Sequence, residues 1–514
     1  MFQFHALWGL TLFPCLLSTA LTGYCTEREL DLDDSTIGFS FARRDEGSGS
    51  DVIALWDAGD WHPLFDGRTL EGWRAAEHPD TWRVEQGLLV AAGPRSHLFY
   101  AGPVGDGDFR NFELEAEVRT DDCADSGIYF HTEYQETGCP TKGYEVQIRN
   151  SRTHADAPRA RQQTGSLSGV RHIWKSCVAD GQWCRLRVRV VADRIQIWVN
   201  DYLTVDYLQP ENPPRGEGDA GKRLSRGTIA LQGQGPAGQV AFRSVRIRPL
   251  PSDADPHLQD RASDAGYGVD PLIMDQLAAH SIPLIDYHIH LRGGLTAAAA
   301  LDRQAVTGIC SGVLDNIGRG WTIETDDQLR AFLDSVAGMP MYVGLQVNDR
   351  DWMHRHSPEL IQRLDYVLAD TMIMPMPDDG GPPVKLWLAD QYTIDDAEAW
   401  MERYMRHNLR VLSEPITILA NPTYLPPAVE KLYDQLWTDQ RMRQVIEAAV
   451  ANHVALEINA SSPWPHERFI RIARSMGAKF TFGTNNSDAK PLSVSRCIDV
   501  ISRLGLTADD LVIQ

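Results

Sequence analysis

The chain has 514 residues, of which 43% are hydrophobic and 23% are charged, and it carries a formal net charge of −21. One hydrophobic core rarely extends over so long a chain, so two globular domains are expected. The excess of negative charge disfavours nucleic acids and anionic membrane surfaces as partners, because binding to either requires a positive face.

The amino-terminal segment, residues 1–23, is predicted to be an export signal peptide. Its apolar run is short for a membrane span, and Ser18 and Ala20 form a small-x-small cleavage site. The mature protein is therefore expected in the periplasm or outside the cell, without a stable membrane span. Residues 24–55 are acidic and rich in Ser and Gly, which predicts a linker.

Residues 56–250 are predicted to form an all-β sandwich. Short segments of alternating polar and apolar residues recur between turn signals, and no long helical period appears. The expected strands are Phe112–Val118, Ser126–Thr132, Gly143–Ile148, Cys184–Val191, Arg194–Val199, Gly227–Gln232 and Gln239–Ile247.

Four cysteines of this region are spaced for short disulfide loops. Cys123 is expected to pair with Cys139, and Cys177 with Cys184, if the protein is exported to an oxidising compartment. The alternative is four free thiols in a reducing compartment.

A second linker is predicted for residues 251–280, and an α/β barrel for residues 281–514. In the latter region apolar strands alternate with amphipathic helices, and seven β-then-α units imply a parallel sheet that closes on itself. The expected helices include Asp326–Val336, Asp395–Leu412, Arg441–Asn452 and His466–Met476. The expected strands are Leu284–His290, Ile309–Asp315, Met341–Val347, Asp365–Ala369, Ile416–Asn421, Ala455–Asn459 and Phe480–Thr484.

Polar residues stand at the ends of these strands. Asp286, His288 and His290 alternate onto one face of the first strand, and two converging imidazoles often begin a metal site. A polar strand face that only contacts neighbouring loops would show the same pattern. Because chemistry in such a barrel belongs at the carboxyl ends of the strands, a site is also expected to include Asp315, Asn316, Gln346, Asn348, Asn421, Glu457, Asn459, Thr484, Asn485 and Asn486.

These motifs resemble the polymerase-and-histidinol-phosphatase (PHP) superfamily of metal-dependent phosphoesterases. The resemblance rests on Asp286–His290, Leu456–Asn459 and Phe482–Thr484. At several positions where that family has acidic or imidazole ligands, this chain has amides. They are Asn316 after the second strand, Gln346 on the third, Asn421 on the fifth, and Asn485 and Asn486 after the last.

The resemblance implies a PHP-like (β/α)7 barrel and leaves two alternatives for its site. In the first, at most one divalent ion (zinc, manganese or iron) binds His288 and His290, helped by Asp315 or Asp488. In the second, the site is an amide-lined pocket for a polyhydroxylated ligand, since amides both donate and accept hydrogen bonds. The expected binding residues are then Asn421, Glu457, Asn459, Asn485 and Asn486.

The first domain resembles the 3-keto-disaccharide hydrolase domain family. The resemblance begins at Trp61–Trp73 and continues in order to Val240–Ile247. Intermediate matches are Trp82–Leu88, Asn111–Leu114, Ser126–His131, Gly143–Ile148 and Arg226–Gln232. The resemblance implies an all-β jelly-roll sandwich of lectin type that cleaves glycosides already oxidised at sugar C3.

Such a substrate has an acidic C2 proton, so a base can remove it and expel the C1 substituent. Glu145 or His131 is the expected base, and Gln147 and Gln232 are expected to bind the sugar. Alternatively, Glu145 is a surface carboxylate paired with Lys142 or Arg149. Trp174, in a loop-like stretch, is the candidate for stacking on a sugar ring, and Lys142 is a further candidate contact.

Two functions follow from these residues. The first is an exported carbohydrate-active hydrolase or lyase that acts on 3-keto glycosides, with a barrel of related hydrolytic or sugar-binding role. The second is a carbohydrate-binding sandwich attached to a metal-dependent hydrolase, or to a barrel that has lost catalysis.

Overall fold

The structure is a computed structural model that describes residues 60–151, 162–234, 238–256, 269–490 and 493–513. The predicted signal peptide and the linker at 24–55 lie outside these residues. Among the described residues, no helix combines the length and apolar character needed to cross a membrane.

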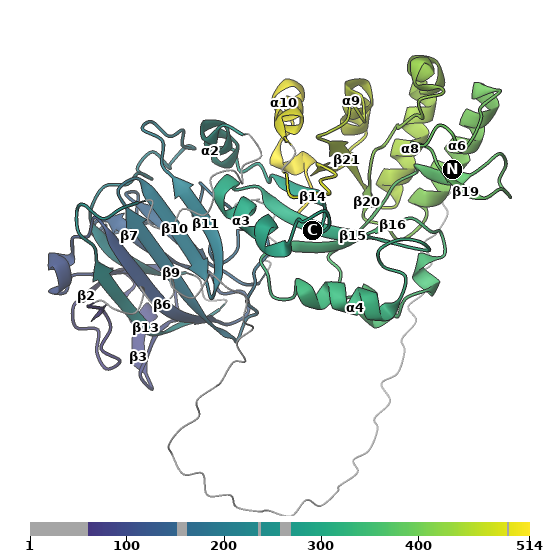
Figure 1. Cartoon of the computed structure of the whole chain (residues 1–514). Helices are drawn as coiled ribbons and strands as arrows, with labels where there is room; N and C mark the ends of the chain where they lie inside the picture. The colour runs from purple at the N-terminus through teal and green to yellow at the C-terminus, as the bar shows by residue number, and fades with distance from the viewer. Residues whose placement is uncertain (1–59, 152–161, 235–237, 257–268, 491–492, 514) are drawn as a thin grey trace, which may run out of the picture. The chain divides into compact units, whose positions relative to one another are not determined.

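The first domain is an antiparallel β-sandwich of two sheets (Figure 1). One sheet has eight strands, in the order β11-β10-β9-β6-β13-β4-β3 with β1 paired to β13, and the other has five, in the order β2-β5-β12-β7-β8. The eight are β1 (His62–Pro63), β3 (Trp82–Glu85), β4 (Leu88–Ala91), β6 (Phe112–Thr120), β9 (Trp183–Val191), β10 (Arg194–Val199), β11 (Tyr202–Leu208) and β13 (Val240–Pro249). The five are β2 (Trp73–Glu77), β5 (Ser96–Tyr100), β7 (Ser126–Thr132), β8 (Tyr144–Ile148) and β12 (Thr228–Gly233).

Period-two alternation explains how the large sheet is built. On β6, the apolar side chains at 114, 116 and 118 are buried between the sheets, while the glutamates between them point the other way. Those glutamates pair with arginines of the neighbouring strands β9 and β13, so that cross-strand ion pairs cover the outer face. The pairs are Glu113 with Arg189 and Arg248, Glu115 with Arg187 and Arg246, and Glu117 with Arg243.

The second domain is a closed barrel of seven parallel strands, which confirms the predicted sheet. The strands, in barrel order, are β14 (Ile285–His290), β15 (Cys310–Ile317), β16 (Tyr342–Val347), β17 (Tyr366–Ala369), β20 (Ile418–Leu419), β21 (Ala455–Asn459) and β22 (Phe480–Gly483). A short hairpin, β18 (Ile373–Pro375) with β19 (Pro383–Lys385), follows β17 and was not predicted.

Helices occupy the connections of the barrel. They are α3 (Ala297–Thr307), α4 (Asp326–Ser335), α5 (Pro358–Ile361), α6 (Ala397–Leu412), α7 (Tyr433–Leu436), α8 (Asp439–Ala451), α9 (Glu467–Ser475) and α10 (Ser495–Leu504). The four helices expected from periodicity are all present, with shifts of one or two residues at their ends. Local capping explains one boundary well: Thr325 and Gln328 form a capping box at the start of α4.

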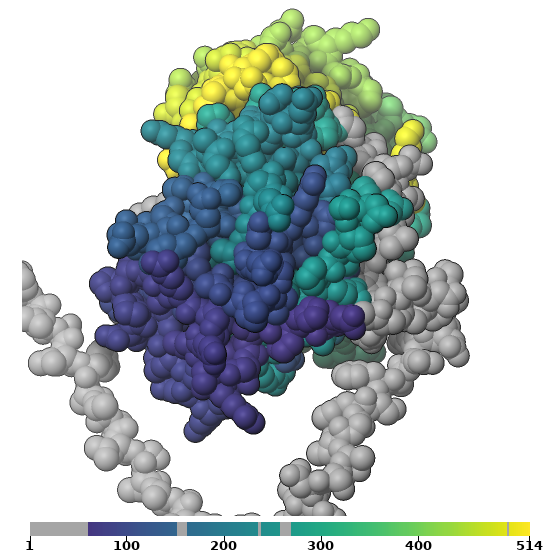
Figure 2. Space-filling view, turned by 90° about the vertical axis from the view of Figure 1, so that its left-hand side faces the viewer, coloured from purple at the N-terminus to yellow at the C-terminus, as the bar shows by residue number. Residues whose placement is uncertain are grey.

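The predicted second linker is helical over part of its described residues. Residues Pro271–Ala279 form helix α2, capped by Asp270, with Met274, Asp275 and Ala278 buried. The two domains also touch directly, since α3 packs against β11 and the Tyr342 hydroxyl donates to the carbonyl oxygen of Trp174 at 2.9 Å. Figure 2 views the molecule from the sandwich side, with its strands in purple and blue and the last helices, in yellow, at the top.

The two predicted disulfides are wrong in this structure. Cys123, Cys139, Cys177 and Cys184 are all free thiols. Spacing in sequence limits loop length, but a disulfide also requires that the two Cβ atoms point at each other. The amide of Cys123 is bonded to Ser151, whereas the carbonyl oxygen of Cys139 accepts from Gln135, so each loop follows its own local contacts.

Candidate functional site

A cavity of about 570 Å³ lies on the five-stranded sheet of the sandwich. Its floor comes from β7, β8 and β12, and its walls from the loops before β8, after β8 and after β11. Gly218 and three residues at 139–141 form part of the walls. The polar residues that line it are Asp125, Tyr129, Glu145, Gln147, Arg149, Ser168, Asp219, Lys222, Gln232 and Gln234.

Glu145 is a buried acid of this cavity, with 8% of its surface exposed. It lies opposite Tyr129 in the register of β7 and β8, and Tyr129 and Ser168 hydrogen-bond to it. Burial raises the pKa of its carboxyl group, and the positive charge of Lys222 opposes that rise. A buried carboxylate with a raised pKa, facing a cavity, has the properties of a general base.

Three amides and an ion pair surround this carboxylate. Gln147 donates to the Asp125 carboxylate at 2.8 Å, and Asp125 also pairs with Arg149. Gln232 donates to the side-chain oxygen of Gln234 at 3.0 Å. These contacts fix the orientations of the two glutamines that the sequence predicted as sugar ligands, and both lie in the same cavity as Glu145.

Lys222 was missed by sequence reasoning. Its ammonium donates to the carbonyl oxygen of Ser168 at 2.8 Å and lies 3.2 Å from the Asp219 carboxylate. It belongs to the long connection between β11 and β12, where no spacing relates it to β8. The only sequence signal was a lysine in a Gly-rich loop, which is too common to identify a site.

His131 does not fit the predicted role of base. Its Nε2 donates to the carbonyl oxygen of Arg110 at 2.8 Å, and its Nδ1 accepts from the amide of Ser225 at 3.2 Å. The ring packs against Phe112 and Phe130, and burial lowers its pKa to about 4. Both nitrogens are therefore used in tying together backbone segments, and the residue does not line the cavity.

Two further sandwich predictions also need correction. Trp174 is 2% exposed and packs against barrel residues, so it offers no open face to a sugar. Lys142 forms a pair with Glu133 at 2.9 Å and does not line the cavity. Glu145 is accordingly not the surface carboxylate of the alternative interpretation.

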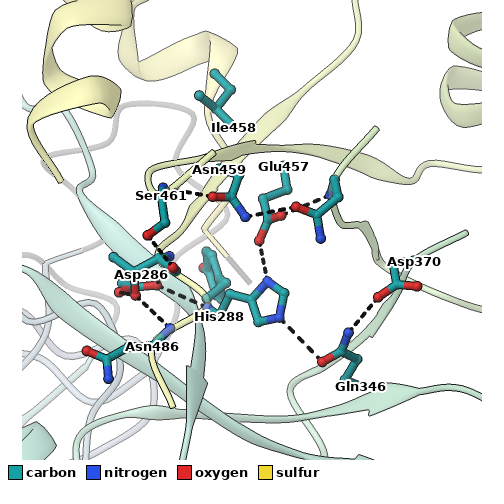
Figure 3. A network of polar contacts seen from close by, with 12 residues as sticks. Asp286, His288, Gln346, Asp370, Glu457, Ile458, Asn459, Ser461 and Asn486 are labelled. Carbon is teal, nitrogen blue, oxygen red and sulfur yellow. Dashed lines mark hydrogen bonds and ion pairs between the residues drawn. The ribbon is translucent and has the colours of Figure 1, made fainter. Parts of the chain in front are cut away.

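In the barrel, the predicted strand-end residues form a buried hydrogen-bond network (Figure 3). His288 lies at its centre: Nδ1 is 2.6 Å from Oε1 of Glu457, and Nε2 is 3.4 Å from Oε1 of Gln346. Glycine is required beside this pair, since a Cβ at Gly483 would lie 2.0 Å from the Glu457 oxygen.

The directions of the hydrogen bonds around Gln346 follow from one guanidinium. Arg292 can only donate, and it bonds Oδ1 of Asn316 at 2.8 Å, so the Asn316 amide nitrogen donates to Oε1 of Gln346 at 3.0 Å. The Gln346 nitrogen then donates to Asp370 at 2.8 Å. His288 must therefore donate towards Gln346 from Nε2.

The protonation state of His288 agrees with these hydrogen-bond directions. Burial alone would lower its pKa, but the charge and hydrogen bond of the Glu457 carboxylate outweigh burial and raise the pKa. A ring that donates from both nitrogens is an imidazolium, and it forms a buried ion pair with Glu457.

The remaining predicted barrel residues divide into two groups. Asn421 and Asn459 are buried and bonded to each other at 2.9 Å, and the amide of Asn421 donates to Glu457. The others lie near the end of β14: the amide of His290 donates to the carbonyl oxygen of Asn486, and His290 bonds the side chain of Asn485. Asn485 is exposed.

The candidate metal ligands do not come together as predicted. The Asp315 carboxylate accepts from the backbone amide of Asn316. The Asp488 carboxylate accepts from the amide of Lys490. Within the described part of the chain, no three His, Cys, Asp or Glu side chains are grouped to hold a metal ion. His288 and His290 therefore lack a third grouped ligand among the described residues, and the arrangement does not fit the predicted centre in that respect.

Comparison with known proteins finds matches to the sandwich domain. Residues 60–248 match a family model described as the 3-keto-alpha-glucoside-1,2-lyase-like domain. A protein of Bacteroides thetaiotaomicron named 3-keto-disaccharide hydrolase is 24% identical over 255 residues, which are 42% of this chain and 87% of that protein. The barrel strands lie outside the matched family region.

Solved structures of low overall similarity also align with part of the chain. One, from Parabacteroides distasonis and provisionally named a glycosyl hydrolase, is 20% identical with a TM-score of 0.32. It covers 40% of this chain and 100% of its own. Another is the carbohydrate-binding module CBM66 of Bacillus subtilis, 12% identical with a TM-score of 0.25, covering 34% of this chain and 95% of its own.

Proposed function

We propose that the sandwich domain cleaves glycosides that carry a ketone at sugar C3, with Glu145 as the base. The observation that carries this proposal is the placement of Glu145, buried and raised in pKa, at a polar cavity within the region that matches the family model. The relative from Bacteroides carries the corresponding name.

The proposed reaction is an elimination across C1 and C2. The Glu145 carboxylate takes the C2 proton, and the electron pair of that C–H bond delocalises onto the C3 oxygen as an enolate. When the enolate collapses, the C1–O bond breaks and the leaving alkoxide takes up a proton. Addition of water to the resulting C1=C2 bond completes a net hydrolysis.

The cavity supplies the other groups that this reaction needs. The Lys222 ammonium provides positive charge where the enolate develops, and preorganised charge of this kind is a large contribution to catalysis. Gln147 and Gln232 offer amides to the sugar hydroxyls, in orientations fixed by Asp125 and Gln234. Tyr129, bonded to Glu145, is a proton donor close to the same site.

Glu145→Gln tests the proposal. The amide keeps the shape but removes the base, so turnover of a 3-keto glucoside should fall to background while binding of the sugar persists. Glu133→Gln is the matched control, since Glu133 belongs to the same β7–β8 region but is exposed and paired with Lys142. Unchanged turnover in Glu145→Gln would contradict the assignment.

The second candidate function is a carbohydrate-binding module, and the same variants separate it from an enzyme. One outcome would identify a binding domain: the wild type binds the sugar, and any cleavage it shows is the same in Glu145→Gln.

For the barrel, we propose a divergent PHP-like domain that binds or processes a related sugar. Its support is the closed parallel barrel with His288 and His290 at the end of the first strand. Exposed Asn485 and the pair of Asn421 and Asn459 are the amides offered to a polyhydroxylated ligand. We also propose export of the mature protein, which sequencing its amino terminus would test.

A further inference from the structure

Helix α2, between the two domains, carries a buried acid that bonds to the sandwich. Asp275 is 1% exposed. Its Oδ1 accepts from Arg171 at 2.7 Å, and its Oδ2 accepts from the Tyr207 hydroxyl at 2.7 Å and from Arg215 at 2.9 Å. Both guanidinium groups are almost fully buried. A single carboxylate therefore compensates two buried positive charges. Removing it would leave both charges buried without a counter-charge, which is strongly destabilising.

Arg215 connects this carboxylate to the wall of the cavity. Its Nε donates to the carbonyl oxygen of Lys222 at 2.8 Å, so it fixes the backbone of the residue whose ammonium enters the site. Its Nη2 donates to the hydroxyl of Tyr144 at 2.8 Å. Tyr144 directly precedes Glu145 on β8. One planar guanidinium thus joins α2 to both charged groups of the proposed reaction.

Arg171 connects the same carboxylate to the opposite wall. Arg171 and Leu167 close a tight turn through backbone hydrogen bonds, and Ser168 lies within that turn. Ser168 hydrogen-bonds to Glu145 and accepts from the ammonium of Lys222. Asp275 therefore holds, through two arginines, both loops that flank Glu145.

Close packing shows that α2 rests directly on one of these loops. A Cβ at Gly216 would lie 2.8 Å from the carbonyl oxygen of Ala279, the last residue of α2. Figure 1 shows α2 near one end of β11, in agreement with the bond that Tyr207 of β11 donates to Asp275. The sequence from 214 to 222 is consequently fixed at one end by the helix and at the other by the cavity wall.

We propose that Asp275 is a positioning residue of the sandwich active site, and that α2 is a structural part of that site although it lies outside residues 60–248. This inference rests on the proposed function of the cavity. It implies that the isolated family-matched region lacks the group that orders its own cavity walls.

Asp275→Asn in the full chain tests the inference, because it keeps the volume and removes the charge. Turnover number on a 3-keto glucoside should fall at least about tenfold, since small misplacement of catalytic groups is costly. The KM should change less, because Gln147 and Gln232 remain bonded as before. Hydrogen exchange of amides at 163–173 and 214–224 should rise, while β6 and β9 stay protected.

Asp270→Asn is the matched control on the same helix. Asp270 caps α2 at its exposed end, and Asn caps a helix as well as Asp does, so activity and exchange should stay at wild-type values. Arg215→Lys adds a graded variant. Lysine can keep the contact to Asp275, but a single ammonium cannot also hold Lys222 and Tyr144, so part of the loss should persist.

Exchange and turnover together separate this inference from the proposed function. If Glu145→Gln abolishes turnover but Asp275→Asn leaves both turnover and loop exchange unchanged, the positioning role is wrong. If Glu145→Gln has no effect, the function is wrong, and the exchange result alone then decides whether Asp275 orders the two loops. Global loss of protection in Asp275→Asn, with Arg215→Lys behaving as wild type, would also overturn the positioning role.

Discussion

The sandwich cavity and the carboxyl end of the barrel are both rich in polar residues, but they use them differently. In the sandwich, Glu145 and Lys222 face a cavity of about 570 Å³. In the barrel, His288, Glu457 and Gln346 bond one another in the interior. A set of acids, imidazoles and amides therefore indicates chemistry where it faces space, and stability where its members satisfy one another.

The largest expected effect comes from breaking the buried pair in the barrel. Glu457→Gln removes the charge that compensates the His288 imidazolium, so the free energy of unfolding should fall by about 3–5 kcal/mol. Urea denaturation followed by tryptophan fluorescence measures it, and sandwich turnover of the folded protein should not change.

Glu359→Gln is the control, since Glu359 is exposed on α5 and its change should stay within about 0.5 kcal/mol. Lost turnover at unchanged stability in Glu457→Gln would instead show that the barrel pair takes part in chemistry, and the contrast between the two regions would fail.

The second effect is catalytic and belongs to the sandwich. Lys222→Met keeps much of the side-chain length but removes the charge near the developing enolate. The turnover number should fall by about 10²- to 10³-fold, the usual cost of losing one preorganised stabilising group. Steady-state kinetics on a 3-keto glucoside measures it.

Lys142→Met is the matched control. Lys142 directly follows the cavity residue Thr141 in the sequence, but its side chain pairs with Glu133 and does not line the cavity. Equal losses in the two lysine variants would mean that net charge, rather than the position of Lys222, determines activity.

Much of the fold could be predicted from the sequence because strands and helices follow from the local repeat of polar and apolar residues. Alternation on β6 and β8 reports which side of a sheet each residue faces, so Glu145 and Gln147 were correctly placed together. The barrel strands were equally visible as apolar runs between amphipathic helices.

The rest depends on contacts between segments that are distant in sequence. Lys222 enters the cavity from a loop, and Asp275 lies in a segment whose composition predicted a linker. Trp174 appeared to be in an open loop, but that loop is buried against the barrel. His131 follows the strand pattern, and only the positions of Arg110 and Ser225 show that its nitrogens are occupied.

A third prediction tests why the barrel network does not fit a metal. Gln346→Glu would place a carboxylate beside His288 as a third protein ligand, the usual minimum for zinc, once zinc displaces the proton from Nε2 of His288. Zinc at about 100 times its dissociation constant should then stabilise the variant by about 2.7 kcal/mol. Thermal unfolding measures this stabilisation. Zinc should stabilise the wild type and the exposed control variant Gln362→Glu much less.

Equal stabilisation of the wild type would contradict the hydrogen-bond directions deduced from Arg292. It would show that zinc replaces the proton on Nε2 of His288 and that the amide at 346 is no obstacle to binding.

The smallest expected effect is a shift in pH dependence at the sandwich. Glu145 must be ionised to accept the C2 proton, and burial raises its pKa, so kcat/KM should fall as the pH drops through a value above the ordinary 4.5 of a glutamate. Lys222 opposes burial, while Asp125 reinforces it, and Tyr129 and Ser168 bond the carboxylate. Removing the lysine charge should therefore raise the pKa further, and the residual activity of Lys222→Met should be lost at a higher pH than that of the wild type. Measured profiles of kcat/KM, which report the free enzyme, decide the matter. A wild-type acid limb at or below the ordinary range of glutamate, or one that moves to lower pH in Lys222→Met, would rule out Glu145 as the titrating base.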